Sequence, residues 1–243
     1  MRQIDFTILL ILFCFLFASG FQNTIQAQNV ADSSFVEQYN KVRVLYFDNF
    51  EQNMKNWIVE TPDSPQSKVS IENGKLVIDV NNGATVWFNK KLSGNIMIEY
   101  NRKVVMNNGE NDRLSDLNQF WMATDPRREN VFTRSGIFSE YDSLKLYYAG
   151  IGGNTNSTTR FRKYQGDGER TLIFDLQDER HLLKPNKTYL IQLVVYNGTT
   201  KVYVDGEFYF SFTDDEPLTE GYFGFRTVMS HQEVENFKVY ELK

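Results

Sequence analysis

The sequence predicts an all-β protein, a two-sheet antiparallel jelly-roll sandwich, from three observations. Short segments in which apolar and polar side chains alternate dominate the chain, and this period of two is that of a half-buried strand. Turn residues separate these segments at short intervals. No window of helical length has a clean apolar face, and only residues 176–184 are expected to form one short helical turn. The βαβ rhythm of a parallel sheet is therefore missing from the sequence.

The expected strands each follow this alternation, and they cover residues 68–71, 75–80, 85–88, 95–100, 118–123, 159–164, 189–196, 202–204, 208–212 and 236–242. Explicit turns are expected at 72–74, 81–83, 93–94, 197–198 and 205–206. Asn-Gly and Asp-Gly dipeptides between alternating segments are strong hairpin signals. Residues 106–168 look least strand-like and hold the densest polar residues, so we expect the working loops there.

The chain divides into a signal peptide (1–27), a polar lead-in (28–41) and a single jelly-roll domain (42–243). Arg2 precedes an uncharged apolar run at 6–18, and Ala27 is a small residue suited to cleavage before Gln28. The run is shorter than the roughly 20 residues that cross a bilayer. We therefore predict an exported protein, periplasmic or secreted, with no membrane association once the signal is cleaved.

Composition excludes several classes of partner. The net charge is −5 and no basic tract occurs, so nucleic acid and anionic membranes are not expected partners. Cys14 is the only cysteine and lies in the expected signal, so the mature chain should contain no disulfide and no thiolate metal site. Aromatic residues make up 15% of the chain, and they suit both half-buried strands and the stacking of sugar rings. We expect a monomer.

Three stretches are more specific than a generic β-protein. They are 111–123 (NDRLSDLNQFWMA), 147–162 (YYAGIGGNTNSTTRFR) and 221–227 (GYFGFRT) with the following 230–231 and 236–240. Together they resemble an uncharacterised family of exported bacterial proteins with a concanavalin A-like lectin/glucanase sandwich, associated with polysaccharide utilisation. The resemblance spans Val44 to the C-terminus and implies the fold and a polysaccharide or oligosaccharide partner, but no settled activity. Gln119 stands where the family has a cysteine, which indicates a structural position.

The polar residues at 111–116 allow two interpretations. They form a loop whose side chains bond their own backbone, or they recognise sugar hydroxyls and carboxylates, with Arg113 as a bidentate fork. Asp112 and Asp116 leave a structural calcium ion open, although their spacing fits no recognised calcium loop. The sequence otherwise predicts no cofactor and no metal site. The glycines at 150–153 lack the Lys-Ser/Thr of a phosphate loop, so nucleotide binding is rejected.

Alternation places Asn118 on one face of its expected strand and Trp121 on the other. Trp121 is either a core residue or a sugar-stacking platform. Arg160, Arg162 and Tyr164 share one strand face, which is either a solvated outer face or a cationic strip for an acidic sugar. Such a strip is expected to lower the pKa of Tyr164 or of Tyr148, because a nearby positive charge favours the phenolate.

Arg226 should point away from the core, because Phe223 and Phe225 alternate with it, and Gly224 should leave room there for a ligand. His231 is preferred over His181 as a base for its place near Arg226. We expect Arg160, Arg162 and Arg226 to meet on one concave sheet face, with Tyr148 or Tyr164 and His231 close by.

Three functions remain open at this point. A polysaccharide lyase needs a base, an acid and cations or amides that stabilise an enolate-like intermediate. A glycoside hydrolase needs two positioned carboxylates, and the E-x-D-x-x-E pattern of glucanases is missing. A glycan-binding protein needs no catalytic acid or base. The candidate catalytic residues are Tyr148, Tyr164 and His231. The candidate substrate-binding residues are Arg113, Asn118, Trp121, Asn154, Asn156, Arg160, Arg162 and Arg226.

Overall fold

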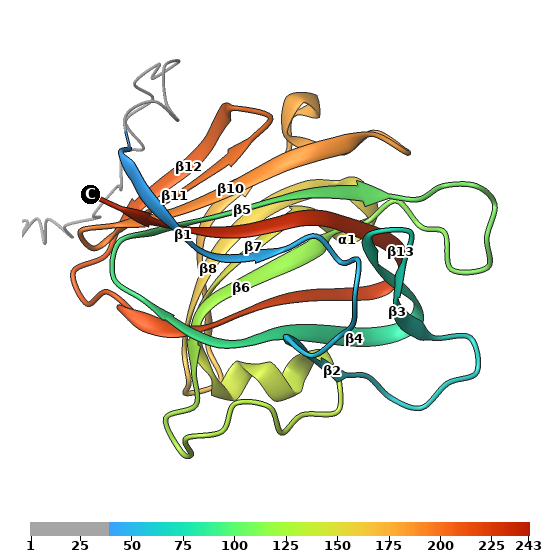
Figure 1. Ribbon diagram of the computed structural model, residues 1–243, viewed down its shortest axis with the longest axis horizontal. Coiled ribbons are helices and arrows are strands. Elements are labelled where there is room, and N and C mark those ends of the chain that lie inside the picture. Colours follow the sequence, from blue (N-terminus) through green and yellow to red (C-terminus); the bar gives the residue numbers. More distant parts are fainter. Residues whose placement is uncertain (1–38) are drawn as a thin grey trace, which may run out of the picture. The chain divides into compact units, whose positions relative to one another are not determined.

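The computed structural model describes residues 39–243, and nearly all of their regular structure is β-strand (Figure 1). In chain order the strands are β1 (Lys41–Asp48), β2 (Trp57–Glu60), β3 (Lys68–Glu72), β4 (Lys75–Ser93), β5 (Ile96–Val104), β6 (Leu117–Thr124), β7 (Lys145–Gly152), β8 (Thr158–Gln165), β9 (Arg170–Leu176), β10 (Thr188–Tyr196), β11 (Thr199–Val204), β12 (Glu207–Thr213) and β13 (Glu220–Leu242). Helix within this part of the chain is confined to short turns: η1 (Phe138–Ser143), α1 (Gly153–Asn156) and η2 (Glu179–His181). No helix among these residues is long and apolar enough to cross a membrane.

The expected signal peptide at 1–27 lies outside the described residues, as does most of the expected lead-in at 28–41. The expected helical turn within 176–184 is present as η2. The turns at 72–74, 93–94, 197–198 and 205–206 each fall between two strands, as predicted.

The strands form two antiparallel sheets, which confirms the predicted jelly-roll class. Sheet I runs β12-β11-β10-β5 and continues into the C-terminal half of β13, which also pairs with β1. Sheet II contains β4, the N-terminal half of β13, β6, β7, β8 and β9, with β2 beside β4. Because β4 and β13 are long enough to belong to both sheets, a single ladder of hydrogen bonds connects the two layers.

The turn expected at 81–83 is wrong, because these residues lie inside β4. Their partner strand is irregular at the same level: the register of β13 shifts between Val228 and Ser230, and Met229 has φ 44°. The extra residue is in β4, where Asn81 and Asn82 lie opposite Met229 alone, and such an insertion bends the pair locally. We call this irregularity the Met229 bulge. The polar, glycine-containing segment of β4 therefore marks the bend between the two sheets instead of a chain reversal.

The core fills the space between the sheets with aromatic side chains. Phe210 of sheet I stacks on Phe174 of sheet II at 5.7 Å between ring centroids, and it also packs on Phe161 at 5.5 Å. Tyr100 of β5 meets Phe225 of β13 edge-on at 4.8 Å. These contacts link strands far apart in sequence, so they close the sandwich.

The outer face of sheet II carries a second apolar cluster. The segment between β6 and β7, residues 125–144, crosses this face and includes η1, drawn in yellow-green in Figure 1. Its Tyr141 packs on Trp87 and Phe120 of the sheet. We call residues 125–144 the cover segment. The region expected to hold the working loops, 106–168, thus contains β6, β7 and β8 as well as this cover.

Candidate functional site

Strand register places three of the predicted polar residues in one row on the outer face of sheet II. Arg226 pairs with Asn118, and Asn118 pairs with Gly150. Gly150 in turn pairs with Arg160 of β8. Residues paired directly across strands point to the same side of a sheet. Since Phe161, the next residue of β8, is in the core, this row points away from it.

A second row lies one step along the same strands. Phe120 pairs with Tyr148, and Tyr148 pairs with Arg162. The Arg162 guanidinium lies 5.3 Å from the centre of the Tyr148 ring, close enough for a cation–π contact. Leu172, the partner of Arg162 on β9, is 50% exposed. This part of the face therefore combines cations with exposed apolar surface. We call Asn118, Tyr148, Arg160, Arg162 and Arg226 the outer-face site.

Arg226 is the most unusual member of the site, because its charge is buried without an acidic partner. The residue is 2% exposed. Its guanidinium lies 4.3 Å from the Phe138 ring and donates a long hydrogen bond of 3.4 Å to the Gly136 carbonyl. Its buried Nε has no hydrogen-bond partner among the described residues. Burial lowers the pKa of Arg226, while Tyr141, Tyr148 and Asp116 raise it in part.

Arg160 and Arg162 are both half-buried but differ in their partners. Arg160 forms an ion pair with Asp175 at 3.2 Å. Within residues 39–243, no carboxylate lies within 4.0 Å of the Arg162 or Arg226 guanidinium. The site therefore holds two positive charges that the described part of the chain does not pair.

Tyr148 is held as a neutral hydrogen-bond donor. Its hydroxyl donates to Asn118 Oδ1 at 2.7 Å and lies 3.4 Å from Asp116 Oδ2. The hydroxyl lies directly above Gly150, and a Cβ added to Gly150 would come within 2.4 Å of it. Burial raises the pKa of Tyr148 well above its usual value, and Asp116 and Tyr164 raise it further. Arg162 and Arg226 lower it, but they do not overcome burial.

The expected lowering of a tyrosine pKa is therefore wrong at both candidates. Burial raises the pKa of Tyr164 to about 12, although Arg170 and Arg162 act in the opposite direction. Tyr164 lies under the cover segment with 0% exposure. A phenol desolvated to this degree stays protonated, so neither tyrosine is a ready base.

The cover segment is fixed to the sheet through a buried acid, Glu60. Its carboxylate accepts hydrogen bonds from Trp87 Nε1 and the Tyr141 hydroxyl, both at 2.8 Å. It also accepts one from the backbone N–H of Arg134 at 2.7 Å. The Arg134 side chain forms an ion pair with Asp125 at 2.7 Å. These contacts hold Gly136 and Phe138, the two cover residues that contact Arg226, in place.

His231 lies apart from the site, contrary to the prediction. His231 lies five positions beyond Arg226 on β13, which is about 16 Å of extended chain. The bulge at Met229 lies between the two, and His231 pairs with Asp79. Its Nδ1 lies 3.3 Å from Asp112 Oδ1. The prediction rested on nearness in sequence, but β13 continues as one extended strand through His231 and carries it away from Arg226.

Arg113, Asn154 and Asn156 also lie outside the site. Arg113 donates to the backbone carbonyls of Val228 and Met229, so its guanidinium holds β13 at the Met229 bulge. Asn156 exchanges two hydrogen bonds with the backbone of Leu183. Asn154 is exposed in the α1 turn. The side chains of Arg113 and Asn156 are therefore structural, and Asn154 does not lie beside the arginines of the site.

Trp121 decides between two open interpretations, and Gly224 corrects an expectation. Trp121 is 0% exposed between the sheets, and its Nε1 donates to Thr200 Oγ1 at 3.2 Å. It is therefore a core residue and not a stacking platform. The space above Gly224 is filled by the Trp87 ring, which an added Cβ would approach to 2.5 Å. Gly224 thus admits a protein side chain, not a ligand.

Sequence reasoning missed the residues that cover Arg226. Gly136 and Phe138 belong to a segment without alternation, so no pattern pointed to them. Asp116 was considered as part of the polar loop and as a calcium ligand, but its place beside Tyr148 was not foreseen. The Asp112 carboxylate accepts hydrogen bonds from the backbone N–H groups of Asn107 and Gly109. Residues 39–243 contain no group of three or more His, Cys, Asp or Glu side chains arranged to hold a metal ion.

Several solved structures share this fold. A protein of unknown function with a galectin-like fold from Bacillus subtilis matches with TM-score 0.70 and 18% identity, covering 84% of this chain and 98% of that one. The carbohydrate binding module CBM66 from Bacillus subtilis matches with TM-score 0.54 and 14% identity, over 78% and 98% of the two chains. The endo-β-1,3-glucanase from Pyrococcus furiosus matches with TM-score 0.56 and 13% identity, over 83% and 95%.

At these identities the likeness shows the fold alone. No curated protein sequence matches the chain. A family model does match, from residue 78 to residue 237, which includes every residue of the outer-face site. The chain belongs to the family described as domain of unknown function DUF6250.

Proposed function

We propose that this protein binds an acidic polysaccharide or oligosaccharide through the outer-face site, with Arg162 and Arg160 contacting a uronate carboxylate. The observation that carries this is the unpaired positive charge of Arg162 and Arg226 on one sheet face. A buried charge without a counter-charge is costly. A bound carboxylate supplies that counter-charge, and a half-buried guanidinium binds it in bidentate fashion.

The chemistry of the surrounding surface supports a sugar as the carrier of the carboxylate. Leu172 offers exposed apolar surface directly beside Arg162, and sugar rings present apolar faces between their hydroxyls. The fold is also shared with a carbohydrate binding module and a glucanase. These two likenesses concern the fold, and they support the proposal without assigning a ligand.

Binding is favoured over cleavage by the state of the acids and phenols. Hydrolysis requires two positioned carboxylates, but Glu60 is bonded to Trp87 and Tyr141, and Asp175 is paired with Arg160. Elimination requires a base near the sugar C5 proton. The Tyr148 hydroxyl instead donates a hydrogen bond to Asn118, and its pKa is raised. We therefore propose a glycan-binding role, outside the cytoplasm and as a monomer.

The test is calorimetric titration with polygalacturonate, alginate and a neutral β-glucan. We expect the acidic polymers to bind and the glucan not to bind at this site. Arg162→Ala should weaken binding about tenfold to a hundredfold, the value of a hydrogen bond to a charged group, and leave the melting temperature unchanged. Arg180→Ala is the matched control, because Arg180 is exposed and lies on η2.

Two results would contradict the proposal. Equal binding of acidic and neutral polymers would remove the role of charge. A rise in the ultraviolet absorbance of unsaturated uronates during incubation would show that the protein is a lyase, the function that the raised tyrosine pKa values argue against.

A further inference from the structure

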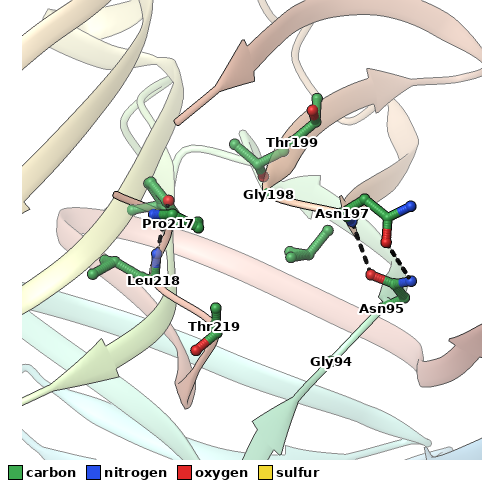
Figure 2. A pocket seen from close by; sticks show the side chains of 11 residues that line it. Gly94, Asn95, Asn197, Gly198, Thr199, Pro217, Leu218 and Thr219 are labelled. Carbon is green, nitrogen blue, oxygen red and sulfur yellow. Dashed lines mark hydrogen bonds between the residues drawn. The ribbon is translucent and has the colours of Figure 1, made fainter. Parts of the chain in front are cut away.

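A cavity of about 170 Å³ lies at the end of the sandwich where three turns meet (Figure 2). Gly94 and Asn95 come from the turn between β4 and β5, and Asn197 and Gly198 from the β10–β11 hairpin. Residues 217–219, before β13, form the opposite wall. The floor is made by three buried strand residues, Tyr147, Val195 and Thr200.

This cavity is separate from the outer-face site. Tyr147 and Tyr148 are neighbours on β7, so their side chains point to opposite faces of sheet II. Tyr148 belongs to the outer-face cluster, whereas Tyr147 and Val195 belong to the core between the sheets. A ligand in the cavity thus approaches the edge of the core, and the inference below does not depend on the function proposed above.

The rim of the cavity is preformed by hydrogen bonds between the turns. Asn95 and Asn197 face each other in Figure 2: Asn197 N donates to Asn95 Oδ1 at 2.9 Å, and Asn95 Nδ2 donates to Asn197 Oδ1 at 3.1 Å. Gly94 N donates to the Thr219 carbonyl at 3.3 Å. On the opposite wall, Leu218 N donates to the Tyr147 hydroxyl at 3.1 Å. A rim held in this way needs little reordering to bind a ligand.

The Tyr147 hydroxyl anchors this wall through a buried ion pair. It donates to Asp214 Oδ2 at 2.5 Å, and the same carboxylate is paired with Lys163 at 2.7 Å. Lys163 also donates to the Glu216 carbonyl at 2.9 Å. The segment that carries Leu218 and Thr219 is thereby tied to β7 and β8 of sheet II.

The lining determines the class of ligand. All 11 lining residues are uncharged, in a chain in which 23% of residues are charged. The floor is largely apolar. The rim carries the amides of Asn95 and Asn197, which bond to each other, the hydroxyl of Thr199, which bonds to Thr213, and the hydroxyl of Thr219. Thr200 Oγ1 accepts the Trp121 indole proton, which leaves its own hydroxyl proton to donate.

The volume limits the ligand to a single ring. An engineered cavity of about 150 Å³ takes up benzene, whereas pockets for drug-sized ligands measure about 300–1,000 Å³. A ring with an apolar face and several neutral hydroxyls matches both the size and the lining. We propose that this cavity binds one uncharged monosaccharide unit, free or at the end of a chain.

Backbone-amide NMR of the mature chain tests this inference. The probes are D-glucose, D-galactose, D-mannose and D-xylose, with D-glucuronate as the charged comparison and cyclohexanol as an apolar ring. We expect at least one neutral sugar to shift the amides of Asn95, Asn197 and Thr219 with a dissociation constant of about 1 mM, the range of a small neutral ligand. D-Glucuronate should not shift them.

Two variants separate this cavity from the outer-face site. Leu218→Trp fills the cavity and should abolish these shifts. Thr219→Val, at an exposed rim position, removes only a hydroxyl and should weaken binding severalfold even if the larger substitution perturbs folding. Arg162→Ala is the control and should leave the shifts unchanged. The inference is overturned if no neutral sugar shifts these amides, if only cyclohexanol does, or if the shifts persist in both cavity variants.

Discussion

Two buried arginines on the same side of sheet II have opposite surroundings. The Arg134 side chain is 6% exposed and paired with Asp125, whereas Arg226 has only a carbonyl and an aromatic ring. Removing one partner of a buried ion pair destabilises the fold, because the other charge is left buried and uncompensated. A buried charge that has no partner to begin with lowers the free energy of unfolding in the same way. Arg226 is therefore expected to serve ligand binding at the expense of stability.

We predict that Arg226→Met raises the free energy of unfolding, by about 1–4 kcal/mol, because an apolar chain of similar length replaces an uncompensated buried charge. The same variant should weaken uronate binding about tenfold, the effect of one charge about 10 Å away at an effective dielectric constant of 20. Urea unfolding and calorimetry measure the two effects.

Arg134→Met is the matched control and should lower the free energy of unfolding by about 3–5 kcal/mol, because Asp125 is left buried and unpaired. If Arg226→Met is as destabilising as Arg134→Met, then Arg226 is part of the scaffold and our interpretation of its surroundings is wrong.

Tyr164 predicts a pH dependence of stability at alkaline pH. Burial raises its pKa to about 12 from the ordinary value of 10.0, so above pH 10 the phenol ionises in the unfolded chain but stays neutral in the folded one. Its contribution to stability is fully present below pH 10 and is lost as the pH rises through 12. Between pH 8 and pH 11 the loss from this group is about 1.4 kcal/mol.

Tyr164→Phe should remove this component, so the variant should lose about 1.4 kcal/mol less than the wild type between pH 8 and pH 11 in urea unfolding. Parallel losses in the two proteins would show that the Tyr164 hydroxyl is solvated in the native state.

Among the elements, β13 contains one residue, Met229, at which the set of side chains that faces the core changes. Met229, which is 48% exposed, adopts a left-handed backbone with φ 44°. Its carbonyl and that of Val228 accept hydrogen bonds from Arg113. The bulge allows one strand to leave sheet II with Arg226 outward and to enter sheet I in a shifted register.

Glycine scanning at the bulge tests this geometry. Met229→Gly should change the free energy of unfolding by no more than about 0.5 kcal/mol, because relief of the left-handed strain offsets the greater freedom of the unfolded chain. Val228→Gly, at the neighbouring exposed position, has no strain to relieve and should lose about 1 kcal/mol. Equal losses at both positions would mean that Met229 is unstrained.

Alternation within one strand was predictable from the sequence, and contact between strands was not. The pattern around Phe161 correctly placed Arg160 and Arg162 on the outer face. Nearness in sequence failed for His231, because β13 continues through it as extended strand instead of turning into a loop. The strand pattern failed for Gly224, whose space is occupied by Trp87 from another strand. Bulges and cross-strand neighbours depend on tertiary packing, which a period-two pattern does not contain.

At the scale of the whole molecule, the fold class followed from strand periodicity and turn chemistry, because both are local properties of the chain. The arrangement of the cover segment did not, since it depends on Glu60 meeting Trp87 and Tyr141 from distant parts of the sequence. Contacts between residues far apart in sequence outnumber local ones, as is usual for antiparallel β-sandwiches.

The proposed export of the chain gives a further prediction. Protein recovered from the native host should begin near Gln28, because the apolar run at residues 6–18 is too short to remain as a membrane span. Intact mass and N-terminal sequencing check this, and size-exclusion chromatography with light scattering checks the expected monomer. A chain that begins at Met1 and fractionates with membranes would refute the signal.

The burial of all three tryptophans has a consequence for optical measurements. Trp57 and Trp121 lie in the core, and Trp87 lies beneath the cover segment. Their fluorescence should therefore be shielded from aqueous quenchers in the native state. Trp121 is bonded to Thr200 on the cavity floor, whereas Trp87 is bonded to Glu60 beneath the cover. Variants that retain one indole each would thus give two separate emission signals, one for the cavity and one for the cover.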